Sequence, residues 1–373
     1  MKPFRILSVT LLLSSLLAGC QTEAVESRKR AQAEKPAKPA KAAHAAKKAP
    51  ADTDEFVNFN DWSDVQSFID GMVERYGFSR EELQRTLGKV RYVDSAVRLM
   101  RPAPPGRPKN WTAYRARFVE PVRIDAGVAF WNRYADALAR AEEQYGVPAE
   151  IIVGILGVET IYGRNTGDFR VMDAITTLAF AYPDTPTRQT RMAYFREELA
   201  NTLLLARDAG IDPFSLRGSY AGAVGWPQFM PGSIRKFGVD FDGDGRIDLR
   251  NSPVDAIGSI ANFLVMHGWR RGEPLVFPAS VDAAAGSGWE LFLNQGLEAK
   301  FRLNEMRAAG VKPETTAPDD LLYGLVDLQN GEAPTEYWLG ANNFFAITQY
   351  NRSFFYAMSV IDLGRAVRVA RGI

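Results

Sequence analysis

Hydrophobic and polar positions along the chain predict a mainly helical protein. Apolar residues recur at helical spacing in several segments. The clearest of these segments are 62–76, 127–145 and 148–162. Between about 272 and 337 the pattern changes to short apolar runs, such as 275–277 and 322–326, separated by Gly, Pro and Asp clusters that are typical of strands and turns. We therefore expect a helical body over 55–373 with a small inserted β-containing unit.

The helical segment 148–162 is apolar on nearly every side, which predicts a buried helix. Pro148 falls in its first turn, where a missing N–H costs nothing. Glu159, near the C-terminal end, is its one interior charge. Burial and the negative end of the helix dipole both raise the pKa of a carboxyl group. Glu159 is therefore a candidate general acid, and the alternative is a buried carboxylate satisfied by a structural partner.

A loop of small residues over 219–225 is a candidate saccharide-binding segment. Small residues let a sugar ring approach the backbone, and Ser219 offers a hydroxyl. Pro227 and Pro231 stiffen the turn that carries Gln228, whose amide can donate to and accept from an N-acetyl group. Ordinary loop hydrogen bonding is the alternative for both polar side chains.

Acidic residues alternate over 240–248 with the spacing of an EF-hand loop. Carboxylates stand at positions 1, 3, 5 and 9 and glycine at position 6: Asp240, Asp242, Asp244, Asp248 and Gly245. Alternate side chains of such a loop converge on a hard cation, and the residue at position 7, here Arg246, offers its carbonyl. The sequence predicts a structural Ca²⁺ here, with an acidic turn that holds no ion as the alternative.

The end of this loop departs from the usual pattern. Position 12 is Asn251, so Asp255, at position 16, is the expected late ligand. The competing interpretation of Asp255 is a helix cap, because Ser252 and the proline after it form a capping-box-like start for a helix over 254–267.

The first twenty residues have the features of a secretory signal. A charged start precedes a short apolar stretch, 6–18, which is too short to span a bilayer and ends in Leu-Ala-Gly-Cys. This ending resembles a bacterial lipobox, with Cys20 as the lipidated residue; an ordinary signal peptide is the alternative. Gln21 is not the aspartate associated with inner-membrane retention, so the sequence favours anchoring in outer-membrane lipid, with the protein on the periplasmic face.

Residues 21–54 are rich in Ala, Lys and Pro and lack the apolar surface that folding needs, which predicts a tether. The formal net charge of +1 excludes the basic field typical of a nucleic-acid-binding protein. The single cysteine excludes disulfides within the chain. The two histidines, His44 in the tether and His267, offer no support for a zinc or serine hydrolase.

Several separate segments, in one order, resemble the membrane-bound lytic murein transglycosylase B family over about 55–373. They are Asn110 to Tyr114, Gly157 to Arg164, Gly225 to Pro231 and Phe345 to Asn351. The resemblance implies a lysozyme-like helical core, Glu159 as the catalytic acid/base, and a saccharide site lined by Tyr114, Ser219, Gln228, Tyr350 and Asn351. One departure is Phe263, where the family has a tyrosine.

A single catalytic acid fits such an enzyme. Most glycosidases use two carboxylates, but none lies near Glu159 in sequence, and Asp168 and Asp173 are expected in a loop. The resemblance implies cleavage of glycan strands of peptidoglycan at the MurNAc-GlcNAc β-1,4 bond, by attack of the sugar's own C6 hydroxyl, to give 1,6-anhydro-MurNAc ends without a catalytic cofactor. A hydrolytic muramidase and a non-enzymatic peptidoglycan-binding lipoprotein are the alternatives.

Overall fold

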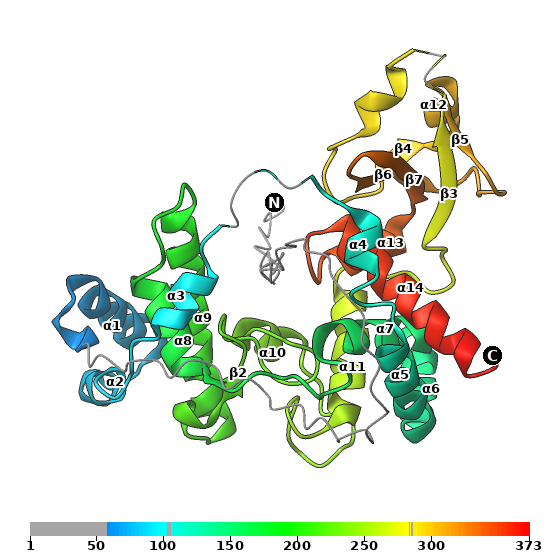
Figure 1. Cartoon of the computed structure of the whole chain (residues 1–373). Coiled ribbons are helices and arrows are strands. Elements are labelled where there is room, and N and C mark those ends of the chain that lie inside the picture. Colours follow the sequence, from blue (N-terminus) through cyan, green and yellow to red (C-terminus); the bar gives the residue numbers. More distant parts are fainter. Residues whose placement is uncertain (1–57, 103–105, 107, 283, 285) are drawn as a thin grey trace, which may run out of the picture.

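The computed structural model describes residues 58–102, 106, 108–282, 284 and 286–373. Helices dominate these residues and a single larger sheet accompanies them, so the predicted mainly α fold with a small β-containing unit is confirmed. Figure 1 shows a helical region around α1, α8 and α9, a second one around α7 and α14, and the sheet above the latter. Cys20 and the predicted tether lie outside the described residues. Within the described ranges, no helix combines the length and apolarity that a membrane crossing requires.

The N-terminal helical region packs three short helices and a 3₁₀ turn against two helices from later in the chain. Its elements are η1 (Phe59–Asp61), α1 (Ser63–Tyr76), α2 (Arg80–Leu87), α3 (Asp94–Leu99), α8 (Val171–Phe180) and α9 (Arg188–Ala209). The Ser79 side chain starts α2 by accepting the N–H of Glu82, which satisfies one free donor of the first turn. The apolar faces of α1 and α2 pack inward through residues such as Ile69 and Leu83.

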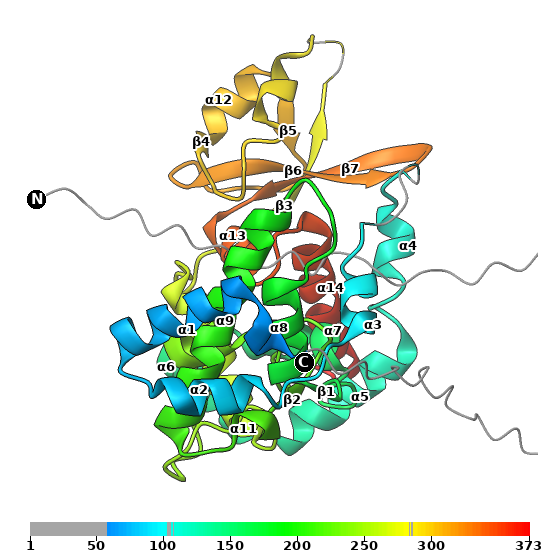
Figure 2. The ribbon, with the colours of Figure 1, turned by 90° about the vertical axis from the view of Figure 1, so that its left-hand side faces the viewer.

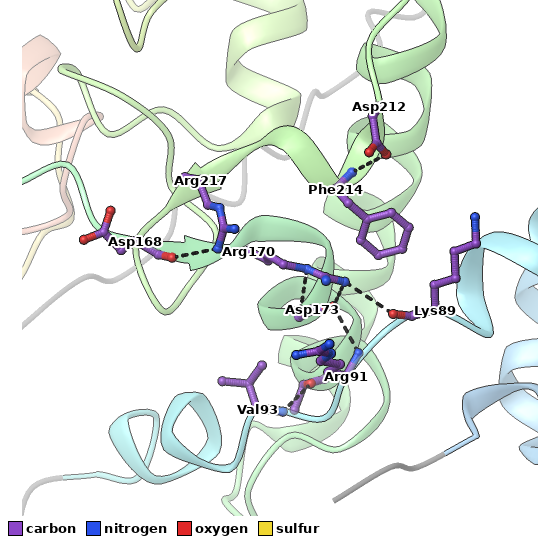
Figure 3. A network of polar contacts seen from close by, with 10 residues as sticks. Lys89, Arg91, Val93, Asp168, Arg170, Asp173, Asp212, Phe214 and Arg217 are labelled. Atoms are coloured by element: carbon purple, nitrogen blue, oxygen red, sulfur yellow. Dashed lines mark hydrogen bonds and ion pairs between the residues drawn. The ribbon is translucent and has the colours of Figure 1, made fainter. Parts of the chain in front are cut away.

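Asp173, on α8, binds the segment between α2 and α3 to the start of α8 (Figure 3). Its buried carboxylate accepts the N–H of Arg91 at 3.0 Å and pairs with Arg170 at 2.8 Å. Arg170 also donates to the carbonyl of Lys89. The expectation that Asp173 lies in a loop was wrong, because residues 171–180 form α8 and its carboxylate is used for structural contacts. Asp168 does lie outside the helices, just before β1.

The second helical region surrounds α7 (Ala149–Thr160). The elements around it are α4 (Trp111–Arg115), α5 (Pro121–Arg133), α6 (Ala135–Tyr145), α11 (Pro253–Met266), α13 (Asn342–Thr348) and α14 (Phe354–Ala370). Four further elements connect this region to α8 and α9: β1 (Phe169–Arg170), η2 (Pro213–Ser215), β2 (Arg217–Gly218) and α10 (Pro231–Phe237). Nearly every residue of α7 is buried, as predicted. It packs closely on α14 because glycines face the other helix: a Cβ at Gly154 would lie 2.2 Å from the carbonyl oxygen of Val360.

Several predicted helix boundaries differ from the structure. Residues 127–145 do not form one helix; α5 and α6 meet at Tyr134, whose φ of −116° and ψ of 28° interrupt the helix. Pro148 is the cap before α7 rather than a residue of its first turn, because its ψ of 139° is extended. The predicted helix over 254–267 begins one residue earlier, and His267 is its C-terminal cap.

The inserted unit is an antiparallel sheet with its own small core. Its elements are β3 (Val276–Val281), η4 (Gly288–Phe292), β4 (Phe301–Arg302), α12 (Leu303–Ala308), β5 (Val311–Pro313), β6 (Leu322–Asn330) and β7 (Ala333–Gly340). The strand order is β4-β6-β7-β3-β5. Leu303, Met306 and Tyr323 are completely buried in a cluster separate from the main core. Both apolar runs predicted as strands fall in or at β3 and β6, and the sheet continues to Gly340.

Candidate active site

Glu159 occupies the last turn of α7, where the backbone leaves the helix abruptly. Ile161 and Tyr162 both have left-handed backbone conformations, with φ of 52° and 54°. The hydroxyl of Thr160 donates to the carbonyl of Trp226 at 3.0 Å and accepts the N–H of Gly163 at 3.0 Å. These contacts fix the end of α7 against the loop that carries Gln228, and Glu159 is held at that junction.

The environment of Glu159 suits a proton donor. Desolvation by burial raises the pKa of its carboxyl group to about 7, and a hydrogen bond donated by the Tyr356 hydroxyl at 2.6 Å lowers it in part. Among the residues that the structure describes, no second carboxylate contributes to this shift. A carboxylic acid with a pKa near neutrality can both give and take a proton at physiological pH.

The Gln228 loop is shaped by strained backbone and internal hydrogen bonds. Gln228 itself has a φ of 52°, in the left-handed region that non-glycine residues rarely adopt and that clusters at functional sites. Its side-chain amide donates to the carbonyls of Gly225, at 2.8 Å, and Thr166, at 3.2 Å. Ser219 accepts the N–H of Ala223 at 3.0 Å, which closes the small-residue loop next to it. Both predicted side chains therefore also take part in loop hydrogen bonding.

Aromatic residues connect this loop to Glu159. Tyr350 donates its hydroxyl to the carbonyl of Pro227 and stacks on Tyr356, with ring centroids 6.2 Å apart and an angle of 14° between the planes. Burial raises the pKa values of Tyr350 and Tyr356, and the charge of Glu159 raises them further. The fold thus brings Glu159, Gln228 and Tyr350 to one place from three distant segments.

Tyr114 approaches the same place from α4. Burial raises the pKa of Tyr114 to about 12, and Glu159 contributes to the increase while Arg117 opposes it. The ring packs edge-on against Phe355, the residue before Tyr356, at 5.4 Å. Asn351, the last of the predicted saccharide residues, is buried directly after Tyr350.

Phe263, where the resemblance leads one to expect a tyrosine, packs against the Tyr350 ring at 4.9 Å. It therefore supplies an apolar contact without a hydroxyl. His267 stacks on Phe263 at 3.9 Å, and its imidazole nitrogen contacts the carbonyl of Phe263 at 2.7 Å. Burial lowers the pKa of His267. His267 therefore packs against Phe263, which in turn contacts Tyr350.

The acidic loop forms a separate candidate cation site. Oxygen atoms of Asp240, Asp242 and Asp244 all lie within 4.8 Å of one another. In this arrangement Asp240 accepts N–H groups from its own loop, including that of Gly245 at 2.8 Å. Converging carboxylates at alternate positions are a donor set suited to Ca²⁺.

Asp255 stabilises the backbone of the acidic loop. Its buried carboxylate accepts the N–H groups of Phe241 at 2.8 Å, Asp242 at 3.2 Å and Asp248 at 2.8 Å. Its own N–H is accepted by the Ser252 hydroxyl at 3.1 Å, which confirms the predicted cap at the start of α11. Asp255 is not one of the three residues whose carboxylates converge.

Comparison with known proteins identifies the family. The family profile described as "Transglycosylase SLT domain" matches residues 59–365. The chain is also 44% identical over 315 residues to membrane-bound lytic murein transglycosylase B of Escherichia coli strain K12, with 82% of this chain and 83% of the relative covered. This chain belongs to the lytic murein transglycosylase B family. It is therefore an enzyme, a lytic transglycosylase that acts on peptidoglycan.

Solved structures of family members share the fold. Soluble lytic transglycosylase SltB1 of Pseudomonas aeruginosa is 45% identical, with a TM-score of 0.74 over 83% of this chain and 100% of that one. The E. coli lytic transglycosylase Slt35 in complex with calcium is 44% identical, with a TM-score of 0.73 over 83% of this chain and 94% of that one. Because the chain belongs to a family of lytic transglycosylases, the alternative of a non-enzymatic peptidoglycan-binding lipoprotein is rejected.

Tyr356, which donates a hydrogen bond to Glu159 of this lytic transglycosylase, was not among the residues predicted for the site. Tyr356 lies in the largely apolar helix α14, 197 positions from Glu159, and nothing at helical spacing marks it as more than a core residue. Its approach to Glu159 depends on the packing of α14 on α7. The Ser353 cap, which accepts the N–H of Tyr356, is the one local signal in this part of the chain.

Proposed function

We propose that this lytic transglycosylase cleaves the MurNAc-GlcNAc β-1,4 bond with Glu159 as its only acid/base and forms 1,6-anhydro-MurNAc ends. The observation that carries the proposal is a single desolvated carboxyl group, with a pKa of about 7, at the centre of the aromatic site. A lone carboxylate does not fit the two-carboxylate pattern of most glycosidases. It does fit a reaction in which the nucleophile belongs to the substrate.

In the proposed reaction the proton of Glu159 goes to the glycosidic oxygen as the bond from that oxygen to the MurNAc C1 breaks. The substrate's N-acetyl carbonyl stabilises the electron-poor C1. The Glu159 carboxylate then removes the proton of the MurNAc C6 hydroxyl while the C6 oxygen bonds to C1, which restores the acid. Tyr356, which donates to Glu159, favours the carboxylate formed between the two steps.

Five residues are proposed to bind the saccharide: Tyr114, Ser219, Gln228, Tyr350 and Asn351. The support is their arrangement, because Tyr114 and Tyr350 both lie close enough to Glu159 for its charge to affect their pKa values. Aromatic rings offer apolar faces to sugar rings, and the Gln228 and Asn351 amides suit N-acetyl groups.

A structural Ca²⁺ is proposed for the acidic loop, bound by Asp240, Asp242, Asp244, the Arg246 carbonyl and Asp255. The convergence of three carboxylates supports the site, as does the calcium complex of a relative. Asp255 accepts three backbone N–H groups here, so its coordination requires some of these bonds to be exchanged for the ion.

Lipid anchoring through Cys20 is proposed for the start of the chain, with the enzyme on the periplasmic face of the outer membrane. The relative is a membrane-bound enzyme, and the lipobox-like sequence supports the same placement. A Cys20→Ser protein exported with a cleavable signal should appear in the soluble fraction with full activity, because lost acyl chains remove about 0.8 kcal/mol per buried CH₂. Its recovery with the outer membrane would contradict lipidation.

The reaction itself is tested by Glu159→Gln, which keeps the shape of the side chain and removes the proton donor. We expect turnover of purified sacculi to fall at least about a thousandfold, because general acid catalysis contributes 10²- to 10⁴-fold and one residue serves both steps. Glycan binding should persist. Glu150→Gln, at the opposite end of α7, is the matched control and should stay active. A fully active Glu159→Gln enzyme would falsify the mechanism.

A further inference from the structure

Among its contacts with the helical core, the inserted β unit touches the helix that carries Tyr114. The tip of the β6–β7 hairpin lies beside α4, the short helix that carries Tyr114 (Figure 2). Asn330 pairs with Ala333 across a two-residue loop, and Gly331 there has a φ of 67°, as the first loop position of a tight hairpin requires. The Gly331 N–H donates to the carbonyl of Lys109 at 2.8 Å, just before α4.

Asn330 holds the first turn of α4 through its side chain. Its Oδ1 accepts both the backbone N–H of Thr112, at 2.8 Å, and the hydroxyl of Thr112, at 2.9 Å. Asn330 is buried, so these bonds are shielded from water. Asn110 caps the same turn by accepting the N–H of Ala113 at 2.8 Å. The two asparagines together satisfy N–H groups that the start of a helix leaves free.

The position of α4 depends on such external support. A helix of five residues is far below the length at which helices are stable alone. Trp111 anchors it from the inside by packing on Phe355. Asn330, which is 218 positions away in sequence, fixes its start from the β unit. Tyr114 is two residues beyond Thr112, and its ring packs on Phe355, so the position of the ring depends on how this turn is held.

We propose that Asn330 is a positioning residue of the active site, through which the inserted β unit holds Tyr114 against the saccharide beside Glu159. Asn330 acts only through α4 and contacts no reacting atom. The proposal rests on the proposed function in one respect, the role of Tyr114 in saccharide binding. By this proposal, the inserted β unit contributes to positioning the substrate in the active site of the helical core.

The test compares Asn330→Ala, Asn330→Asp and the control Gln329→Ala in the full chain, with kcat and KM measured on soluble peptidoglycan fragments. Asn330→Ala removes the acceptor, so KM should rise about tenfold or more as Tyr114 loses its place. Asn330→Asp keeps an oxygen acceptor for both Thr112 donors and should restore most of the wild-type KM. Gln329 is exposed on the same strand and contacts Asp327, so its replacement should change neither constant.

A second arm separates positioning from general loss of stability. In a Tyr114→Ala background, Asn330→Ala should add nothing to the rise in KM, because the residue it positions is gone. Fully additive effects, or a lower melting temperature with an unchanged KM, would overturn the proposal. Wild-type kinetics of Tyr114→Ala alone would overturn both this proposal and the saccharide role of Tyr114. Glu159→Gln would still report on the reaction independently.

Discussion

The end of α7 and the acidic loop before α11 both depend on carboxylates, but in opposite ways. Glu159 stands alone in a desolvated aromatic environment, and the pKa of its carboxyl group is raised to about 7. Asp240, Asp242 and Asp244 stand together, and two of them are exposed to solvent. A desolvated carboxyl group retains its proton, whereas exposed carboxylates that share a site bind cations.

Asp255 supports the acidic loop that carries the three converging aspartates. It is as buried as a core residue, yet three N–H groups face its two oxygens and lower the pKa that burial raises. Glu159 has one hydrogen-bond donor with a comparable effect, the Tyr356 hydroxyl. Burial raises the pKa of both carboxyl groups, but three donors oppose it at Asp255 and one at Glu159.

The largest effect expected from this contrast is in the pH dependence of catalysis. The pKa of Glu159 is raised, so the acid is protonated below about pH 7 and is lost as the pH rises through that value. The rate limited by the acid should then fall about tenfold per pH unit on the alkaline side. A rate that stays constant from pH 6 to pH 9 would contradict the assignment.

The Tyr356→Phe variant uses the same pH-rate measurement to test what sets the pKa of Glu159. The Tyr356 hydrogen bond lowers the pKa of Glu159, so its removal should move the alkaline limb to higher pH. The plateau rate should fall about tenfold or more, since a hydrogen bond to a charged group contributes about 1.5–3 kcal/mol. Tyr350→Phe, which removes a hydroxyl bonded to Pro227 rather than to Glu159, is the control and should leave the limb in place.

A smaller effect is expected when calcium is added to the purified protein. A ligand bound only by the native state stabilises it by about 2.7 kcal/mol at a hundred times its dissociation constant, which should appear as a rise of a few degrees in melting temperature. Asp244→Ala should abolish that rise. Asp320→Asn, at an exposed acid of the β unit, is a control that should retain it. An unchanged calcium response in Asp244→Ala would refute the site.

Much of the site could be predicted because its parts carry local signals. The apolar run of α7 with one interior acid predicted a buried helix and a carboxyl group of raised pKa, and the structure has both features. The alternating aspartates predicted a convergent cluster for the same reason, since the spacing itself creates the geometry. Strands β3 and β6 of the β unit followed from apolar runs between turn residues.

The features that could not be predicted depend on tertiary contacts, which leave no pattern in the local sequence. The break between α5 and α6 falls at Tyr134, without a proline or glycine to mark it. Asp173 lies in α8, within the N-terminal helical region, where Arg91 and Arg170 bind its carboxylate. Tyr356 and Asn330 act across 197 and 218 positions of sequence, so only the folded chain brings them to Glu159 and Thr112.

The most direct test of the central claim, a single acid that works with the substrate's own C6 hydroxyl, is the mass of the products. Purified sacculi digested by the enzyme should give muropeptides that are each one water lighter than hydrolytic products. They should carry no new reducing end, because the C6 oxygen replaces water as the nucleophile. Mass spectrometry that found reducing MurNAc ends instead would contradict the account and identify a hydrolytic muramidase.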